Sequence, residues 1–158
     1  MFRPMQRIRQ QLSDDDCVKI LNREKRGVLS VLGDDGYPYG LPINYWRCPD
    51  DGRIYFHGGL SGHKIDALAN CDKASFCVCE QGEKREGEWW YRVRSIIIFG
   101  RVHMVLDESL AAEASRQLSL KFTTDLHYIE DEINRLITVT RCFCLVPEHM
   151  TGKIVTEK

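Results

Sequence analysis

Tight turn signals join one β-rich run to the next through the first half of this 158-residue chain. The run GVLSVLG (27–33) enters the turn Asp34-Asp35-Gly36, and YPYGLPINYW (37–46) returns as a second strand. A further turn at 49–52 leads into a third strand, RIYFH, which ends at His57. Strands joined by connections this short pair antiparallel, so this half of the chain does not form a parallel α/β sheet.

Three further strands and four helices complete the predicted secondary structure, with Gly100 as a bend in the longest strand. The predicted strands cover residues 27–33, 37–46, 53–57, 73–80, 90–106 and 136–146. The predicted helices cover residues 13–25, 63–70, 107–120 and 125–135, with a mobile loop at 81–88 and EHMTGK (148–153) as the end of the ordered chain. Six strands with few helices between them predict a mainly β fold with peripheral helices, in the form of a small antiparallel barrel.

The composition indicates one soluble domain, residues 1–158, in which residues 1–11 form an N-terminal arm that is either solvated or laid on a partner subunit. The 22 basic and 23 acidic side chains leave a net charge of −1, which gives no electrostatic support for a nucleic-acid partner. No apolar run approaches the roughly 20 residues that cross a membrane, and the first residues lack the apolar segment of a secretory signal, so neither a membrane span nor secretion is expected. Seven cysteines without extracellular targeting predict reduced thiols in a cytoplasmic protein.

The stretch IYFHGGLSGHKIDAL (54–68) reads as a strand, a glycine-rich turn and the start of a helix. Free backbone N–H groups at a helix start, together with a cation, form an anion site, and phosphate is the anion that most often fills one. The hydroxyl of Ser61, the ring of His63 and the ammonium of Lys64 could all donate to it, and Gly62 allows close approach. The alternative is that Ser61 is only a helix cap and Lys64 a solvated residue.

Two cysteine pairs, Cys77–Cys79 and Cys142–Cys144, raise the alternative of a zinc site. Residues two apart on an extended strand lie roughly 6.5–7 Å apart, whereas two sulfurs on one zinc ion lie about 3.8 Å apart. Small buried thiols therefore account for the pairs better than a metal does, and no metal site is predicted. A lone histidine such as His57 is commonly structural, but its place beside the candidate anion site makes it a candidate for catalysis.

Four segments follow one another in the chain: GVLSVLGDDGYPYGLPINY, IYFHGGLSGHKIDAL, RSIIIFGRVHMV and HMTGK. In this order they resemble the pyridoxamine 5′-phosphate oxidase-like flavoproteins, and within them the 5-nitroimidazole resistance branch, from about Leu12 to Lys153. This resemblance implies a six-stranded antiparallel split β-barrel that forms a homodimer and binds FMN at the subunit interface.

The resemblance also implies roles for individual residues. His63 and Lys64 match the basic pair that grips the FMN phosphate, at the helix start that contains Ser61 and Gly62. A polar position on the long strand matches Ser95, and the strand-end histidine near the flavin matches His57. The strand whose backbone follows the edge of the isoalloxazine ring matches Pro42, Ile43 and Asn44. Pro38 and Pro42 independently predict an edge or a bulge there, because proline donates no ladder hydrogen bond.

These features predict an FMN-dependent oxidoreductase that reduces a small flat acceptor such as a nitroaromatic, with His57 hydrogen-bonding or protonating the acceptor. One alternative is a flavin-binding sensor or carrier without turnover. Another is pyridoxamine phosphate oxidase activity, but the arginine-containing substrate motif of those enzymes is missing from LVPEHMTGK near the carboxyl end. The expected partners are a second copy of the chain and a small aromatic acceptor, with neither nucleic acid nor membrane.

Overall fold

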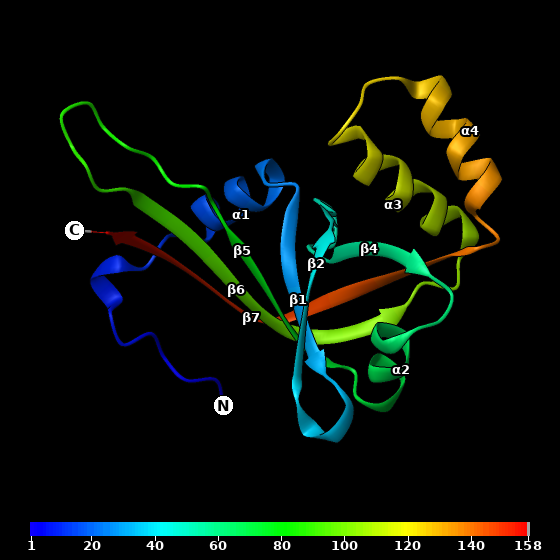
Figure 1. Ribbon diagram of the computed structural model, residues 1–158, viewed down its shortest axis with the longest axis horizontal. Helices are drawn as coiled ribbons and strands as arrows, with labels where there is room; N and C mark the ends of the chain where they lie inside the picture. Colours follow the sequence, from blue (N-terminus) through cyan, green and yellow to red (C-terminus); the bar gives the residue numbers. More distant parts are fainter. Residues whose placement is uncertain (158) are drawn as a thin grey trace.

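The computed structural model describes residues 1–157, and seven strands of this part of the chain form one antiparallel sheet (Figure 1). The strands follow in the order β2-β1-β5-β6-β7-β4-β3 across the sheet. Their bounds are β1 (Arg26–Leu32), β2 (Pro38–Asn44), β3 (Trp46–Arg47), β4 (Ile54–Gly59), β5 (Lys73–Cys79), β6 (Arg92–Met104) and β7 (Thr140–Thr156). The predicted mainly β, antiparallel fold is confirmed.

The sheet curls into a split barrel, as the connection between β2 and β3 requires. Only Tyr45 separates these two strands in the sequence, yet they stand at opposite ends of the strand order. The two ends of the sheet must therefore come together, which happens only if the sheet closes on itself. The phenol of Tyr45 is fully buried and donates a 2.9 Å hydrogen bond to the Leu21 carbonyl oxygen, which holds the crossing point against α1 (Asp14–Arg23).

The prediction of six strands is corrected to seven, because the segment 37–46 is two strands rather than one. Burial of the Tyr45 side chain breaks the ladder there, and the chain turns from one sheet end to the other. β2 pairs with β1 alone among the described strands, so the edge position expected from Pro38 and Pro42 is confirmed. A register shift between Phe99 and Gly100 confirms the bend predicted in the long strand.

The closing strand was predicted too early and too short. Leu136 belongs to the last turn of a helix, and β7 begins at Thr140. β7 then continues to Thr156, so the segment 148–153 lies inside a strand instead of ending the ordered chain. The reason is the length of β6, whose first half offers a pairing edge to the second half of β7, for example Ser95 opposite Lys153.

Four α-helices surround the sheet, each near its predicted position, and side-chain caps start three of them. Ser13 accepts from the backbone N–H of Asp16 at the start of α1, and Asp107 and Asp125 cap the other two in the same way. The helices capped by Asp107 and Asp125 are α3 (Glu108–Leu120) and α4 (Leu126–Leu136), and the fourth helix is α2 (His63–Asn70). Short 3-10 turns lie at Ile8–Gln10 and Asp34–Gly36. None of the helices within residues 1–157 is long and apolar enough to cross a bilayer.

The core lies on the concave side of the curled sheet. Phe56, Phe76 and Phe143 are at most 1% exposed, and the ring of Phe56 contacts the other two with centroids 5.2 and 5.3 Å apart. A second, smaller core forms where α3 covers the opposite face of β4 and β7, around Tyr55 and Cys142. α3 and α4 pack together beyond this face, at one end of the molecule (Figure 1). Both faces of β4 are therefore covered.

The N-terminal arm lies against the chain's own sheet. The backbone N–H of Leu12 donates to the carbonyl of Gly152, and Gln11 bridges to Lys153 on β7. The ring of Phe2 stacks on His149, with centroids 4.8 Å apart and planes 6° apart. Most side chains of residues 1–11 nevertheless remain exposed, so the arm contacts β7 through Phe2 and Gln11 while the rest of it stays accessible to solvent.

Candidate functional site

The glycine-rich turn after β4 brings the start of α2 back to the end of the strand. Gly62 is the N-cap of α2 with φ at 115°, a backbone angle that favours glycine, and no side chain caps this helix start. The alternative in which Ser61 is a helix cap is therefore wrong, and the Ser61 side chain is exposed. The first backbone N–H groups of the helix have no intrahelical partner, so they remain available to a ligand.

Lys64 turns inward from the helix start and is half-buried at the open end of the barrel. Its Nζ lies 5.1 Å from the centre of the buried Phe143 ring, a cation–π contact. It forms no ion pair or hydrogen bond with any other described residue. Burial lowers the pKa of Lys64. A half-buried ammonium without a counter-charge is costly, so this position suits an external anion.

Gly58 on β4 makes room for this ammonium. A Cβ atom added at Gly58 would lie 2.5 Å from Lys64 Nζ, closer than the two atoms can approach. An alanine at position 58 would therefore displace the Lys64 ammonium from its present position.

Arg141 is a further cation at this place that the sequence did not single out. It is the cross-strand partner of Gly58, so its side chain leaves the same face of the sheet as the one that Lys64 occupies. Its Nε atom is buried and has no hydrogen-bond partner among the described residues. Only the register between β4 and β7 places it here, and no local sequence signal reveals that register.

His63, the other member of the predicted basic pair, points away from Lys64. Its ring stacks on Tyr39 with centroids 4.1 Å apart, and its Nε2 lies 3.6 Å from Asp34 Oδ2. The start of α2 thus rests on the β1–β2 hairpin through His63 and reaches toward the barrel interior through Lys64. The two cations that flank Gly58 are therefore Lys64 and Arg141.

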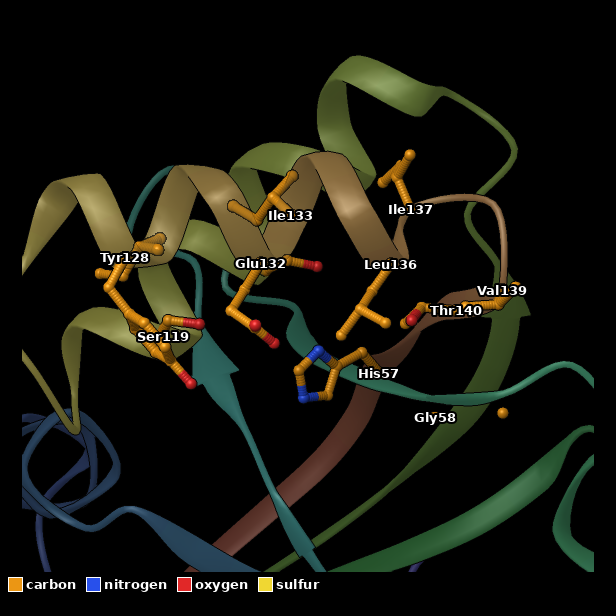
Figure 2. Close-up of a pocket in the computed structure, with 13 residues that line it drawn as sticks. His57, Gly58, Ser119, Tyr128, Glu132, Ile133, Leu136, Ile137, Val139 and Thr140 are labelled. Carbon is orange, nitrogen blue, oxygen red and sulfur yellow. The ribbon is translucent and has the colours of Figure 1, made fainter.

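His57 lies on the opposite face of β4 and forms part of the floor of a cavity of about 490 Å³ (Figure 2). The cavity is enclosed by the end of β4, helices α3 and α4, and the start of β7. Burial lowers the pKa of His57, and the charge of Lys64 lowers it further. The imidazole is therefore neutral at pH 7, where it can both donate and accept a hydrogen bond.

The three residues of β2 predicted to lie along the edge of the isoalloxazine ring, Pro42, Ile43 and Asn44, occupy different environments. Pro42 is exposed on the convex side of β2, whereas the side chain of Ile43 is buried in the core, so only its backbone can meet a ligand. The Asn44 amide oxygen accepts a 2.9 Å hydrogen bond from Arg26 Nε, so part of its side chain is already engaged.

Ser95 does not lie near His57 in a single chain. It pairs with Lys153 on β7, whereas His57 pairs with Cys142 near the other end of the same strand. The stretch of β7 from Cys142 to Lys153 measures roughly 36 Å along the strand at about 3.3 Å per residue. One copy of the chain therefore cannot bring both residues to one end of a small ligand.

The cysteines lie on strands as expected, with Cys77 and Cys79 on β5 and Cys142 and Cys144 on β7. All seven thiols are free, and residues 1–157 contain no group of three or more histidine, cysteine or acidic side chains that could hold a metal. Burial raises the pKa of Cys142 to about 12, so this thiol stays protonated and unreactive at neutral pH.

Comparison with known proteins identifies the family. The family model described as pyridoxamine 5′-phosphate oxidase matches residues 13–154, which is most of the chain. The protein therefore belongs to the pyridoxamine 5′-phosphate oxidase family. A search of the curated proteins finds no match.

Solved structures share the fold at low sequence identity. One is a candidate 5-nitroimidazole antibiotic resistance protein from Bacteroides thetaiotaomicron, with a TM-score of 0.78 and 19% identity over 92% of this chain and 87% of that one. Another is a conserved hypothetical protein from Mycobacterium tuberculosis, with a TM-score of 0.79 and 16% identity over 95% and 90% of the two chains. A third is an FAD-binding protein from Mesorhizobium loti, with a TM-score of 0.68 and 21% identity over 92% and 97%. These likenesses support the split barrel.

Proposed function

We propose that this protein is a flavin-dependent oxidoreductase that binds FMN and passes electrons to a small flat acceptor such as a nitroaromatic. The observation that carries the proposal is the half-buried, unpaired Lys64 beside the uncapped start of α2. A phosphate placed there would receive backbone N–H donors and an ammonium at once. The buried, unpartnered Nε of Arg141 adds a donor on the same side of the sheet. The residues present therefore fit a flavin phosphate.

The family and two relatives support a flavin over other phosphate ligands. The structurally similar proteins from Mesorhizobium loti and Mycobacterium smegmatis are named as FAD-binding proteins. The bound flavin would supply the electron-transfer chemistry, while the protein orients it and controls access of water. His57 would meet the acceptor on the cavity side of β4, and Ser61, His63 and Gly62 would line the approach to the phosphate.

The proposed active form is a homodimer with flavin at the subunit interface. The convex face of the sheet carries Val28 on β1 and Ile97 and Phe99 on β6, each at least 40% exposed. The two strands flank β5, and Val28 and Ile97 both pair with its Cys77, so they lie on the same face. Pro42 extends the same row on β2. Apolar side chains gathered on one face indicate an association surface. Because one chain keeps Ser95 far from the end of β4 beside Lys64, a role for Ser95 at this flavin would require the Ser95 of a second copy.

We expect Ile97→Glu to convert the dimer into a monomer, because a carboxylate buried in an apolar interface loses its hydration without gaining a partner. Molar mass is read from light scattering during gel filtration, with flavin content measured on the same peak. Leu126→Glu is the matched control, since Leu126 is an equally apolar, 59% exposed residue on α4, away from this face. An Ile97→Glu protein that elutes as a dimer would show that the convex face is not the interface.

The activity test is whether NADH or NADPH reduces the bound flavin and an added nitroaromatic reoxidises it. Turnover supports an oxidoreductase, whereas a flavin that binds but is neither reduced nor reoxidised supports the sensor or carrier. The missing arginine motif leads us to expect no pyridoxamine phosphate oxidation in the same assay.

We expect His57→Ala to retain flavin but to reduce acceptor turnover about 100-fold, the typical contribution of a positioned proton donor or acceptor. Because the pKa of His57 is lowered, the histidine should lose its neutral form only below pH 6.5, and turnover should fall in that range. His103→Ala replaces an exposed histidine on β6 and should leave turnover unchanged. Full turnover per bound flavin in His57→Ala would remove His57 from the mechanism.

A further inference from the structure

The cavity above His57 carries both apolar and polar side chains in its walls. Its volume of about 490 Å³ lies within the range of small-molecule sites. Ile133 and Leu136 of α4, with Val139 before β7, form an apolar wall. Polar groups lie among these side chains, with Glu132 beside Leu136 on α4 and Thr140 beside Val139, and His57 forms part of the floor (Figure 2). The walls therefore suit a flat, mainly apolar molecule.

Glu132 of α4 supplies the only carboxylate among the described residues that line the cavity. Figure 2 shows its carboxylate and the His57 ring directed toward each other across the cavity. Glu132 Oε1 accepts a 2.5 Å hydrogen bond from Arg135, whose side chain is 68% exposed. Oε2 accepts no hydrogen bond within residues 1–157, so one oxygen is left for a ligand.

The charge balance inside the cavity is negative. No lysine or arginine is among its described lining residues. His57 is neutral at pH 7, since burial and the nearby Lys64 lower its pKa. The exposed Arg135 neutralises the carboxylate only weakly, because solvent screens a pair of this kind. A bound anion would face Glu132 without a compensating cation, whereas a cation or an N–H donor would find an acceptor.

We infer that this cavity binds a flat aromatic molecule with a cationic or N–H-donating end, which it orients with that end on Glu132 and the ring against Ile133 and Leu136. Glu132 is then the residue that selects the class of ligand. The inference deepens the proposed function and rests on it in one respect, since His57 is the residue proposed to meet the electron acceptor. The acceptors used best would accordingly be cationic or N–H-bearing aromatics, and anionic ones would be excluded.

The test uses two probes of nearly equal shape and opposite charge, 1-naphthylmethylamine and 1-naphthoate. Their affinities for the purified protein are measured by isothermal titration calorimetry at pH 7, and the flavin content of the same sample is measured by absorbance. We expect the ammonium probe to bind at least about tenfold more tightly than the carboxylate probe. Glu132→Gln should weaken the ammonium probe about tenfold or more, the usual loss for a charge-assisted hydrogen bond.

Two further variants make the result specific. Asp131→Asn removes the neighbouring carboxylate of α4, which is 67% exposed and pairs with His127 instead of lining the cavity, and it should change neither affinity. Leu136→Trp fills the cavity from its partly exposed wall and should abolish binding of both probes. Thermal unfolding of each variant checks that the fold is retained. If Glu132→Gln does not fold, loss of both probes in Leu136→Trp together with the charge preference of the unaltered protein decides the question.

The inference is overturned if the probes bind equally, if neither binds at millimolar concentration, or if Glu132→Gln and Asp131→Asn have the same effect. Its failure differs from failure of the proposed function. A protein that contains flavin and rejects both probes contradicts the cavity assignment alone. A protein that binds the ammonium probe through Glu132 but neither contains nor takes up flavin contradicts the proposed function alone.

Discussion

Lys64→Met should weaken FMN binding about 10- to 100-fold, the loss expected when a phosphate loses one charge-assisted contact. Methionine keeps the apolar part of the side chain over Phe143, so the variant removes the charge while largely preserving the packing. The dissociation constant is measured by titrating flavin-free protein with FMN and following the quenching of flavin fluorescence.

Lys73→Met provides the matched control, because Lys73 is an exposed lysine at the start of β5 and forms no ion pair within residues 1–157. It should leave the affinity unchanged. If Lys64→Met binds FMN as tightly as the unaltered protein, the phosphate lies elsewhere. Arg141→Met tests the second cation separately, and a loss of similar size would place both side chains at the phosphate.

Phe76→Ala should lower the free energy of unfolding by about 3–5 kcal/mol, the largest single-residue effect on stability that we expect. The side chain is fully buried and makes edge-to-face contacts with Tyr45 and Phe56, at centroid distances of 4.9 and 5.2 Å. Its ring fills the space next to Gly27, where an added Cβ atom would lie 2.4 Å from Phe76 Cζ. Removing the ring leaves a cavity at the crossing point where the barrel closes.

Urea unfolding followed by circular dichroism measures this loss, and an unchanged slope would show that the denatured state is not affected. Phe122→Ala removes a 41% exposed ring near the surface and should cost less than about 1 kcal/mol. Equal costs for the two variants would contradict the assignment of Phe76 to the core that holds the barrel closed.

The local parts of the fold could be predicted because they depend on neighbours in sequence. Ser13 caps α1 through a residue three positions away, and Asp34-Asp35-Gly36 turns the first hairpin within its own few residues. Tyr45 could not be recognised as a break, because its burial depends on Leu21 and Phe76, which are distant in the sequence. Burial set by distant contacts overrides local strand propensity at such positions.

The candidate site likewise contains some residues that the sequence predicts and others that only the fold reveals. The helix start at Gly62 and the inward cation Lys64 follow from a glycine-rich turn that can be read in the sequence. Arg141 and Glu132 could not be found from the sequence. Arg141 comes to Gly58 through the register of β4 and β7. Glu132 faces His57 because α4 packs on α3 and so lies across the cavity from the end of β4.

The visible absorption spectrum of the purified protein, followed by identification of the molecule released on denaturation, tests the central proposal most directly. We predict a yellow protein that releases about one FMN per chain. Release of FAD would keep the flavoprotein and correct the cofactor. A colourless protein that also fails to bind added FMN or FAD would contradict the account, because the unpaired Lys64 would then serve some other anion.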